Sequence, residues 1–188
     1  MELLVVRHAK TIANAQGDIS GQSFAPLTEN AFIETYLLAA KLMKSNIDTI
    51  YSSDLLRARQ TAQRLRIQLS VQGRINYSKN LREINYGALE GKNKLLVMKD
   101  NPRFHRDPNY VAPNGESFSQ LQTRVERFMK RIRGKTILIV AHAGTIRAFY
   151  AIFAAKQASD VINMHISNAV ILQCELVSKK KKATFLAR

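Results

Sequence analysis

Two histidines follow directly on short apolar segments, and one of them has an arginine beside it. Arg7-His8 comes after residues 3–6, and His142 comes after residues 137–141. Both apolar segments have the length and β-branched content of buried strands in an α/β sheet. Ligands of such sheets bind beyond the carboxyl ends of the strands. If the two strands are parallel neighbours, both imidazoles and the Arg7 guanidinium converge on one crevice, which would place a nucleophile in an anion site.

Phosphoryl transfer to an enzyme nucleophile requires residues of the types found at several other positions. A histidine that attacks phosphorus has to be neutral and oriented through its second ring nitrogen, a role that fits His8. Charge on the phosphoryl oxygens requires fixed cations and donors, and the planar fork of arginine matches phosphate. Candidates for this clamp are Arg7, Arg57, Asn14 and His142. Glu83 fits the acid that protonates the leaving oxygen and could then activate water.

The periodicity of apolar residues predicts the elements that position these groups. Strands are expected over residues 2–7, 47–51, 75–78, 137–141, 169–177 and 183–186, with 75–78 as a short edge strand. Helices are expected after Pro26, from about residue 54 to Gln68, from Ser117, and over 145–155. Because strands alternate with helices, we predict a three-layer α/β/α sandwich with a mostly parallel central sheet.

Cap residues predict where each helix begins, and the spacing of apolar residues predicts which of its faces is buried. Thr28 is the predicted N-cap of the first long helix, whose apolar face should comprise Phe32, Tyr36, Ala39, Ala40 and Met43. Ser52, Ser53 and Asp54 offer cap residues that place Arg57 in the first turn of the next helix, where phosphate is favoured. Ser117 and Gln120 form a capping box before a helix with one apolar face, made of Phe118, Leu121, Val125, Phe128 and Ile132.

Length and composition favour one domain over residues 1–188, with 46% hydrophobic and 23% charged residues. Residues 11–24 are expected to form a loop, and residues 80–113, which contain three of the four prolines, a lid or side insertion. The chain lacks the roughly 18-residue apolar stretch of a membrane helix, and residues 3–6 are too short for a signal-peptide core. We therefore expect a cytoplasmic protein, and a buried thiol at Cys174.

The balance of charge is strongly positive, with 29 Lys and Arg against 14 Asp and Glu. A basic surface captures anionic partners, among which phosphorylated metabolites, nucleic acid and acidic lipid all qualify. The one dense basic run, residues 179–182, is interpreted as a solvated hairpin turn in preference to a nucleic-acid or membrane patch. A non-catalytic polyanion-binding protein is the alternative, and it predicts binding that falls steeply with salt and does not depend on His8. Nothing in the sequence indicates an oligomeric state.

Several blocks of the sequence, taken together, resemble the histidine phosphatase superfamily, also called phosphoglycerate mutase-like. Arg7-His8-Ala9-Lys10-Thr11 with Asn14 is similar to its opening motif, and residues 26–29 and 51–62 match the following stretches. Similar blocks recur at residues 81–84 with Gly87, 90–91, 115–117 and 139–144 with Arg147. They occur in family order over about three quarters of the chain, and the phosphatases most similar in length and opening segment include α-ribazole phosphatases.

The resemblance implies a metal-independent phosphomonoesterase without a cofactor, acting on a small phosphorylated metabolite. It further implies that His8 becomes phosphorylated, that Glu83 is the proton donor, and that Arg7, Arg57 and His142 bind the phosphoryl group. Asn14 and the backbone of Gly144 are expected to contact that group as well. Ser20 and Gly21 match positions on the substrate side. No His or Cys pair has metal-ligand spacing, in agreement with that expectation.

Departures from the family pattern concern the surroundings of the nucleophile. Ala9 and Ala143 stand where glycine is usual, and Lys10 replaces an acidic or amide residue, so each could narrow the substrate or slow the reaction. Residues 86–94 are similar to mutases, which makes a phosphoglycerate mutase-type phosphotransferase the alternative. A phosphatase is preferred because about thirty residues after Glu83 are too few for a mutase lid.

Three further residues have a structural as well as a functional interpretation. His105 is interpreted as part of a solvated basic loop in preference to a substrate contact, and His165 as structural. Tyr86 could either reach the substrate or simply pack.

Overall fold

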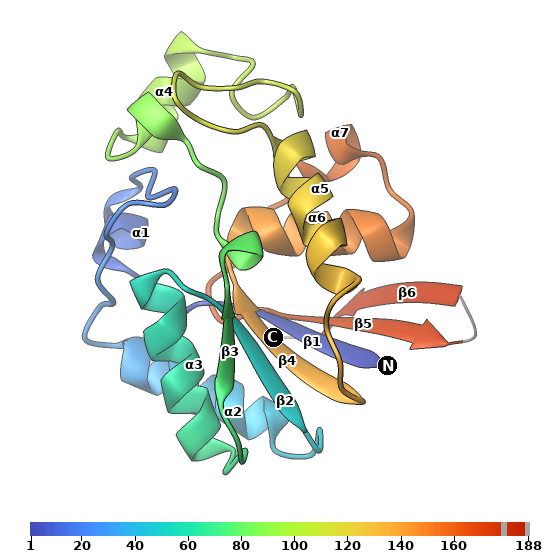
Figure 1. Cartoon of the computed structure of the whole chain (residues 1–188). Helices are drawn as coiled ribbons and strands as arrows, with labels where there is room; N and C mark the ends of the chain where they lie inside the picture. Colours follow the sequence, from blue (N-terminus) through green and yellow to red (C-terminus); the bar gives the residue numbers. More distant parts are fainter. Residues whose placement is uncertain (178–179, 187–188) are drawn as a thin grey trace.

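A six-stranded sheet runs through the middle of the molecule, and helices cover both of its faces (Figure 1). The computed structural model describes residues 1–177 and 180–186. The strands, in chain order, are β1 (Glu2–Arg7), β2 (Thr49–Ser53), β3 (Ile75–Ser78), β4 (Thr136–Ala141), β5 (Ile171–Val177) and β6 (Lys180–Phe185). They lie in the order β3-β2-β4-β1-β5-β6. β1 to β4 are parallel, and β5 is antiparallel to both neighbours, so the predicted mostly parallel α/β sandwich is confirmed.

Helices lie on both faces of the sheet, and two short ones lie beyond the carboxyl end of its strands (Figure 1). In chain order they are α1 (Ile12–Gln16), α2 (Ala31–Leu42), α3 (Leu56–Gln68), α4 (Lys94–Asp100), α5 (Phe118–Met129), α6 (Ala143–Ala154) and α7 (Ala158–Val161). Short 3-10 turns cover Lys79–Leu81 and Gly87–Leu89. α2 and α3 pack on the face that carries Leu4 and Val6, and α5 and α6 on the face that carries Leu3 and Val5. β1 thus buries both of its faces, as a central parallel strand does.

The register of the central strands brings the two histidines together. β1 pairs with β4 in parallel, and Arg7 lies opposite Ala141. The residues that follow these two are His8 and His142, which therefore leave the sheet side by side at the carboxyl end of the strands. β2 lies on the other side of β4, so the start of α3 reaches the same end. The predicted convergence of the two imidazoles and Arg7 is confirmed.

The predicted apolar face of α2 is confirmed at Ala39 and wrong at its other positions. The structure buries Ala31, Thr35, Leu38, Ala39 and Leu42, while Phe32, Tyr36 and Met43 are 59%, 62% and 72% exposed. This helix is apolar on two adjacent stripes, so periodicity alone does not choose between them. The sheet and α3 take the stripe with the smaller side chains, since these allow the closer approach that dense packing needs.

The helix caps also differ from those predicted, except at α5. Thr28 is not a cap: its hydroxyl donates to the carbonyl of Lys10, and α2 begins after Asn30 without a side-chain cap. α3 begins after Leu55, and the Ser53 hydroxyl accepts from the Leu55 N–H without capping the helix itself. The capping box of Ser117 and Gln120 is present as predicted, and the face of α5 with Val125 is buried.

The predicted loop 11–24 contains a short helix and is tied to the segment above it. α1 begins with a capping box formed by Thr11 and Asn14. The Ile19 N–H donates to the Lys92 carbonyl, the Gly91 N–H to the Ile19 carbonyl, and the Lys94 N–H to the Gly17 carbonyl, at 3.0, 2.8 and 3.0 Å. Residues 80–113 thus close over the loop at the carboxyl end of the sheet (Figure 1). Their movement as a lid stays a prediction.

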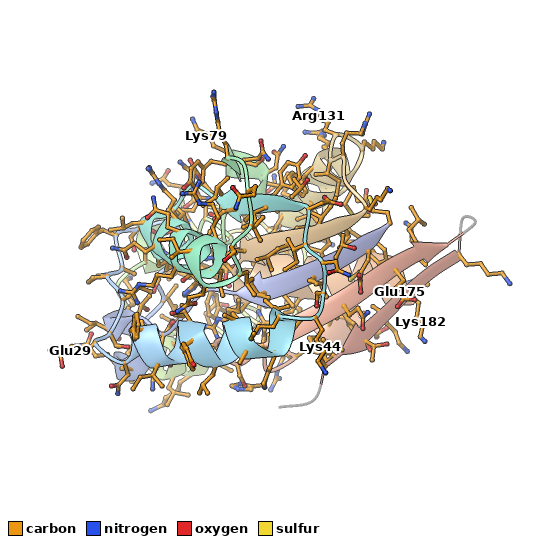
Figure 2. The ribbon with its side chains drawn as sticks, turned by 90° about the horizontal axis from the view of Figure 1, so that it is seen from below. Glu29, Lys44, Lys79, Arg131, Glu175 and Lys182 are labelled. Carbon is orange, nitrogen blue, oxygen red and sulfur yellow. The ribbon has the colours of Figure 1, made fainter. Side chains whose placement is uncertain are left out.

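Three of the four lysines of the basic run near the C-terminus lie on a strand, not in the predicted turn. Lys180, Lys181 and Lys182 are exposed residues of β6, the outermost strand, whereas Lys179 lies outside the described residues. Figure 2 shows Lys182 at this outer edge of the sheet. Charged edge strands discourage further strand pairing. Cys174 is buried on β5, as predicted. Among the described residues, no helix is long and apolar enough to cross a membrane.

Candidate active site

A cavity of about 530 Å³ opens at the carboxyl end of the central strands. Its wall is built by the end of β1, the starts of α3 and α6, the loop with α1, the segment 80–113 and residues 165–168. Seven of the nine predicted site residues line it: Arg7, His8, Asn14, Ser20, Gly21, Arg57 and Glu83. The other two lie directly behind the wall, where the His142 ring is 5.0 Å from the His8 ring and the Gly144 N–H donates to Glu83.

His8 is held in the state that a nucleophile needs. Its Nδ1 lies 2.7 Å from the carbonyl oxygen of Ala9, an acceptor, so Nδ1 carries the proton and Nε2 the lone pair. Burial, followed by the charges of Arg57 and Arg7, lowers the pKa of His8 well below 6.5. The imidazole is therefore neutral at neutral pH, and its unprotonated nitrogen is Nε2.

Arg57 lies directly against that nitrogen. It is the second residue of α3, is 2% exposed, and its Nε donates to His8 Nε2 at 3.3 Å. Its terminal nitrogens donate to the carbonyl oxygens of Ser23 and Gly21, which fixes the plane of the guanidinium. A fixed cation beside the attacking atom is positioned to stabilise charge on a phosphoryl group that arrives there.

His142 is oriented by a serine that the sequence indicated only as a helix cap. Its Nε2 lies 2.9 Å from the hydroxyl of Ser53, which already accepts the N–H of Leu55. The Ser53 proton is thus free to point at Nε2, so that Nδ1 carries the ring hydrogen. His142 Nδ1 is buried and has no partner in the described part of the chain. This donor can bind a phosphoryl oxygen, and burial lowers the pKa of His142, as do the charges of Arg57 and neighbouring groups.

Arg7 and Asn14 offer two further donors. Arg7 donates to the carbonyl of Ile166, and its Nε is buried without a partner among the described residues. Burial lowers the pKa of Arg7 to about 10, so it remains a cation at neutral pH. The amide oxygen of Asn14 accepts from Thr11 and Asn168, which leaves its amide nitrogen as the donor for a ligand.

Two backbone N–H groups hold the Glu83 carboxylate. The N–H of Ile84 donates to Oε1 at 2.9 Å, and the N–H of Gly144 donates to both carboxylate oxygens at 3.1 Å. Gly144 is the second residue of α6, where a helix N-terminus favours a carboxylate. A Cβ atom at position 144 would overlap Oε1 of Glu83, so this approach requires glycine. The contact of Gly144 with a phosphoryl group stays a prediction.

An ion pair behind Glu83 fixes the backbone of the same segment. Arg124 of α5 donates to the carbonyls of Asn80 and Glu83 at 2.8 and 2.9 Å, and it pairs with Glu116 at 2.6 Å. Glu116 also accepts from the N–H of Asn85. This pair has no signature in the sequence, because its partners are eight positions apart and only one of them lies in a helix.

The loop that carries Ser20 and Gly21 depends on close contact with Glu90. Glu90 accepts the N–H groups of Gln22 and Tyr86, and so joins the loop to the segment above it. Gly21 has φ +46°, and a Cβ there would overlap the Glu90 carboxylate, so glycine is required on both grounds. Ser20 lines the cavity, with its hydroxyl buried and unpartnered among the described residues.

The interpretation of His105 as a solvated loop residue was wrong. His105 is 8% exposed, lines the cavity and stacks edge-on against Phe104. Burial, followed by the charges of Lys94 and Arg147, lowers its pKa to about 3. Phe104 packs in a small apolar cluster with Ile19 and Val97. Because this packing buries Phe104, the neighbouring His105 lies inside the molecule and not in solvent.

The departures from the family pattern fall on different sides of the cavity wall. Lys10 and Ala143 line the cavity, whereas Ala9 is not among its lining residues and is almost fully buried. Tyr86 also lines the cavity, and so does His165, which is exposed. Within the described part of the chain, no three His, Cys, Asp or Glu residues gather in a way that could hold a metal ion.

Comparison with known proteins shows which family the chain belongs to. The model of the histidine phosphatase superfamily (branch 1) matches residues 3–187. The adenosylcobalamin/alpha-ribazole phosphatase of Salmonella typhi is 30% identical, with 88% of this chain and 86% of that protein covered. The metal-independent phosphoserine phosphatase of Arabidopsis thaliana is also 30% identical, with 88% and 74% covered. The structure of the alpha-ribazole phosphatase from Shigella flexneri is 25% identical and superposes with a TM-score of 0.85, covering 99% of this chain and 96% of that one. The chain therefore belongs to branch 1 of the histidine phosphatase superfamily and is a phosphatase.

Proposed function

We propose that this phosphatase hydrolyses small phosphomonoesters through a phosphohistidine formed on Nε2 of His8. The observation that carries the proposal is the pairing of His8 Nδ1 with the Ala9 carbonyl, because it leaves the Nε2 lone pair beside Arg57. A neutral imidazole with one fixed proton is the reactive form of this nucleophile.

In the first step, His8 Nε2 attacks phosphorus and the bond from phosphorus to the ester oxygen breaks. Glu83, in its acid form, gives its proton to the departing oxygen, which leaves as an alcohol. Arg57, Arg7 and the Nδ1–H of His142 stabilise charge on the phosphoryl oxygens, and Asn14 donates beside them. These groups are fixed by the protein before the substrate arrives, which is what makes such stabilisation effective.

In the second step, the Glu83 carboxylate takes a proton from water and the oxygen of that water attacks phosphorus. The phosphorus–nitrogen bond breaks, inorganic phosphate leaves, and His8 returns to its neutral state with Glu83 protonated again. The Gly144 N–H contacts both oxygens of Glu83, so the carboxylate keeps one position while its charge changes between the steps.

The test is metal-free hydrolysis of an aryl phosphate by the wild type, His8→Ala and Glu83→Gln, in water enriched in oxygen-18. We expect loss of activity with His8→Ala and a strong fall with Glu83→Gln. Released phosphate should carry one oxygen from water. Activity that survives the loss of His8 would overturn the proposal. Arg103→Gln, which removes an arginine from an exposed ion pair, is the control for charge removal.

The mutase alternative is tested in the same assay by adding an alcohol acceptor. A mutase returns the phosphoryl group to that alcohol in place of water, whereas the proposal predicts free phosphate as the product. A small phosphorylated metabolite as substrate, a cytoplasmic location, and a single domain over residues 1–188 with a lid at 80–113 belong to the same proposal. The cavity volume supports the first of these, because small-molecule sites commonly enclose about 300–1,000 Å³.

A further inference from the structure

One edge of the sheet carries a basic surface that lies outside the cavity. Between residues 55 and 82 the chain has seven arginines and lysines and no carboxylate. This stretch contains α3 and β3, and β3 is an edge strand of the sheet. The 3-10 turn Lys79–Leu81 follows β3 and contacts α5. Exposed cations of three elements therefore meet along this edge, and the proposed function gives them no role.

Two side-chain contacts join these elements into one surface. The Arg59 guanidinium of α3 lies over the ring of Tyr77 on β3, 5.0 Å from its centroid. Lys79 comes two residues after Tyr77, which is about 7 Å of extended chain. Next to Lys79, the carbonyl of Asn80 accepts from Arg124 of α5 at 2.8 Å. Arg124 thus marks the side of α5 that faces this edge.

Two more cations of α5 lie on that side of the helix. Arg127 and Arg131 come three and seven positions after Arg124, and residues at these spacings share one helix face. The Arg131 N–H donates to the carbonyl of Phe128, so the helical turn continues beyond Met129, the last residue of α5. Both arginines therefore extend the surface that begins at Arg59 and Lys79.

We call this surface the basic ridge, which comprises Arg59, Tyr77, Lys79, Arg127 and Arg131. All five side chains are exposed. Figure 2 shows Lys79 and Arg131 projecting from the same side of the molecule. Within the described residues none of the four cations forms an ion pair, and nearby Asp54 is occupied by Arg82. Glu126 lies on another side of α5. The positive charge of the ridge is therefore uncompensated.

We propose that the basic ridge binds the phosphate backbone of single-stranded nucleic acid. Its cations follow one another along the edge of the sheet, as the phosphates of a strand do. Tyr77 adds an exposed aromatic ring on which a base can stack. An acidic lipid surface fits less well, because peripheral binding also inserts apolar side chains. The exposed apolar side chains of α2, the helix between Glu29 and Lys44 in Figure 2, lie on the opposite side of the molecule.

The test is the fluorescence anisotropy of a labelled single-stranded oligonucleotide, titrated with the full chain. The oligonucleotide lacks a terminal phosphate, so the cavity has no phosphomonoester to bind or hydrolyse. Binding is measured between about 0.05 and 0.2 M salt. We expect the logarithm of the binding constant to fall with the logarithm of the salt concentration with a slope of about −3, because each of the four cations contributes about −0.7 on a single strand.

Variants assign the binding to the ridge. Lys79→Gln combined with Arg131→Gln should make the slope shallower by about 1.4 and weaken binding about 25-fold at 0.1 M salt, since each lost contact costs about fivefold there. Lys180→Gln combined with Lys182→Gln is the matched control, because it removes the same charge from exposed positions of β6, at the far edge of the sheet. This control should bind nearly as the wild type does. Tyr77→Leu should weaken binding without changing the slope, because the ring carries no charge.

The outcomes separate the ridge from the catalytic site. Both double variants should hydrolyse an aryl phosphate as the wild type does, and His8→Ala should bind the oligonucleotide with unchanged affinity. Unchanged binding by Tyr77→Leu would overturn the stacking of a base on this ring.

Three results would overturn the proposal as a whole. An equal loss of binding in the two double variants would mean that net charge alone attracts the strand. Binding to vesicles of phosphatidylserine and phosphatidylcholine, with none to the oligonucleotide, would assign the ridge to a lipid surface. Binding to neither would remove the ridge as a docking surface and leave the phosphohistidine mechanism standing.

Discussion

A single methyl group added at position 144 should lower the rate of catalysis and leave the stability of the fold nearly unchanged. Gly144 is the second residue of α6, is buried, and its N–H holds both oxygens of Glu83. A Cβ atom at this position would overlap Glu83 Oε1. In Gly144→Ala the carboxylate has to move by about 1 Å to restore an ordinary van der Waals separation.

The expected cost to catalysis is large. A misplacement of about 1 Å in a reacting group lowers the rate on the order of 10²-fold, or about 2.7 kcal/mol of activation free energy. The helix itself should tolerate the substitution, because alanine is favoured over glycine in helices by up to about 1 kcal/mol. We therefore expect kcat to fall about 100-fold while KM and the melting temperature change little.

Steady-state kinetics with an aryl phosphate and a thermal melt check this prediction, and a double-mutant cycle isolates its cause. In a Glu83→Ala background there is no carboxylate to displace, so Gly144→Ala should have almost no further effect on kcat. A Gly144→Ala enzyme with the kcat of the wild type would refute the placement of Glu83 as the acid and base. An equal fall in both backgrounds would refute the route through Glu83.

Three further predictions follow from the partners of the site residues. Ser53→Ala removes the hydroxyl that orients His142, so kcat/KM and the affinity for vanadate should both fall about tenfold. Ser52→Ala is the control, because the Ser52 hydroxyl contacts only a backbone carbonyl, and this variant should bind vanadate as the wild type does. Glu116→Gln frees Arg124 from its ion pair and should lower kcat by about tenfold, with Asp107→Asn in the exposed pair as a neutral control. Because the pKa of His8 is lowered well below 6.5, its reactive neutral form persists as the pH falls through 6.5. Once the second ionisation of the substrate near about pH 6 is corrected for, kcat/KM should show no acid limb at 6.5, and such a limb would contradict the buried, neutral His8.

The sequence was sufficient for the centre of the fold. The strands at 2–7 and 137–141 were predictable because both are short, β-branched and apolar throughout, as central parallel strands are. Their polar continuations, Arg7-His8 and His142, then had to meet at one end of the sheet. Arg57 was placed in the first turn of its helix for a similar reason, although the helix begins without the predicted side-chain cap.

Features that depend on which surfaces meet were not predictable. The α2 helix offers two adjacent apolar stripes, and only packing on the sheet decides that Leu38 is buried and Tyr36 exposed. His105 lies in a basic loop that resembles a solvated one, and it turns inward because Phe104 completes an apolar cluster contributed by distant segments. The partner of Ser53 is 89 positions away, so its role beside His142 has no local signature.

Trapping of the phosphoenzyme tests the central claim most directly. Glu83→Gln and His8→Ala are mixed with substrate, quenched within milliseconds, digested at neutral to alkaline pH and analysed by mass spectrometry for phosphorylated peptides. With an aryl phosphate, whose leaving oxygen departs without a proton, we predict that an acid-labile phosphoryl group accumulates on His8 in Glu83→Gln because the water-activating carboxylate is absent. His8→Ala should give no phosphorylated peptide. The mechanism would be contradicted if the wild type turns over the substrate and Glu83→Gln carries no phosphoryl group on His8, or carries one on another residue.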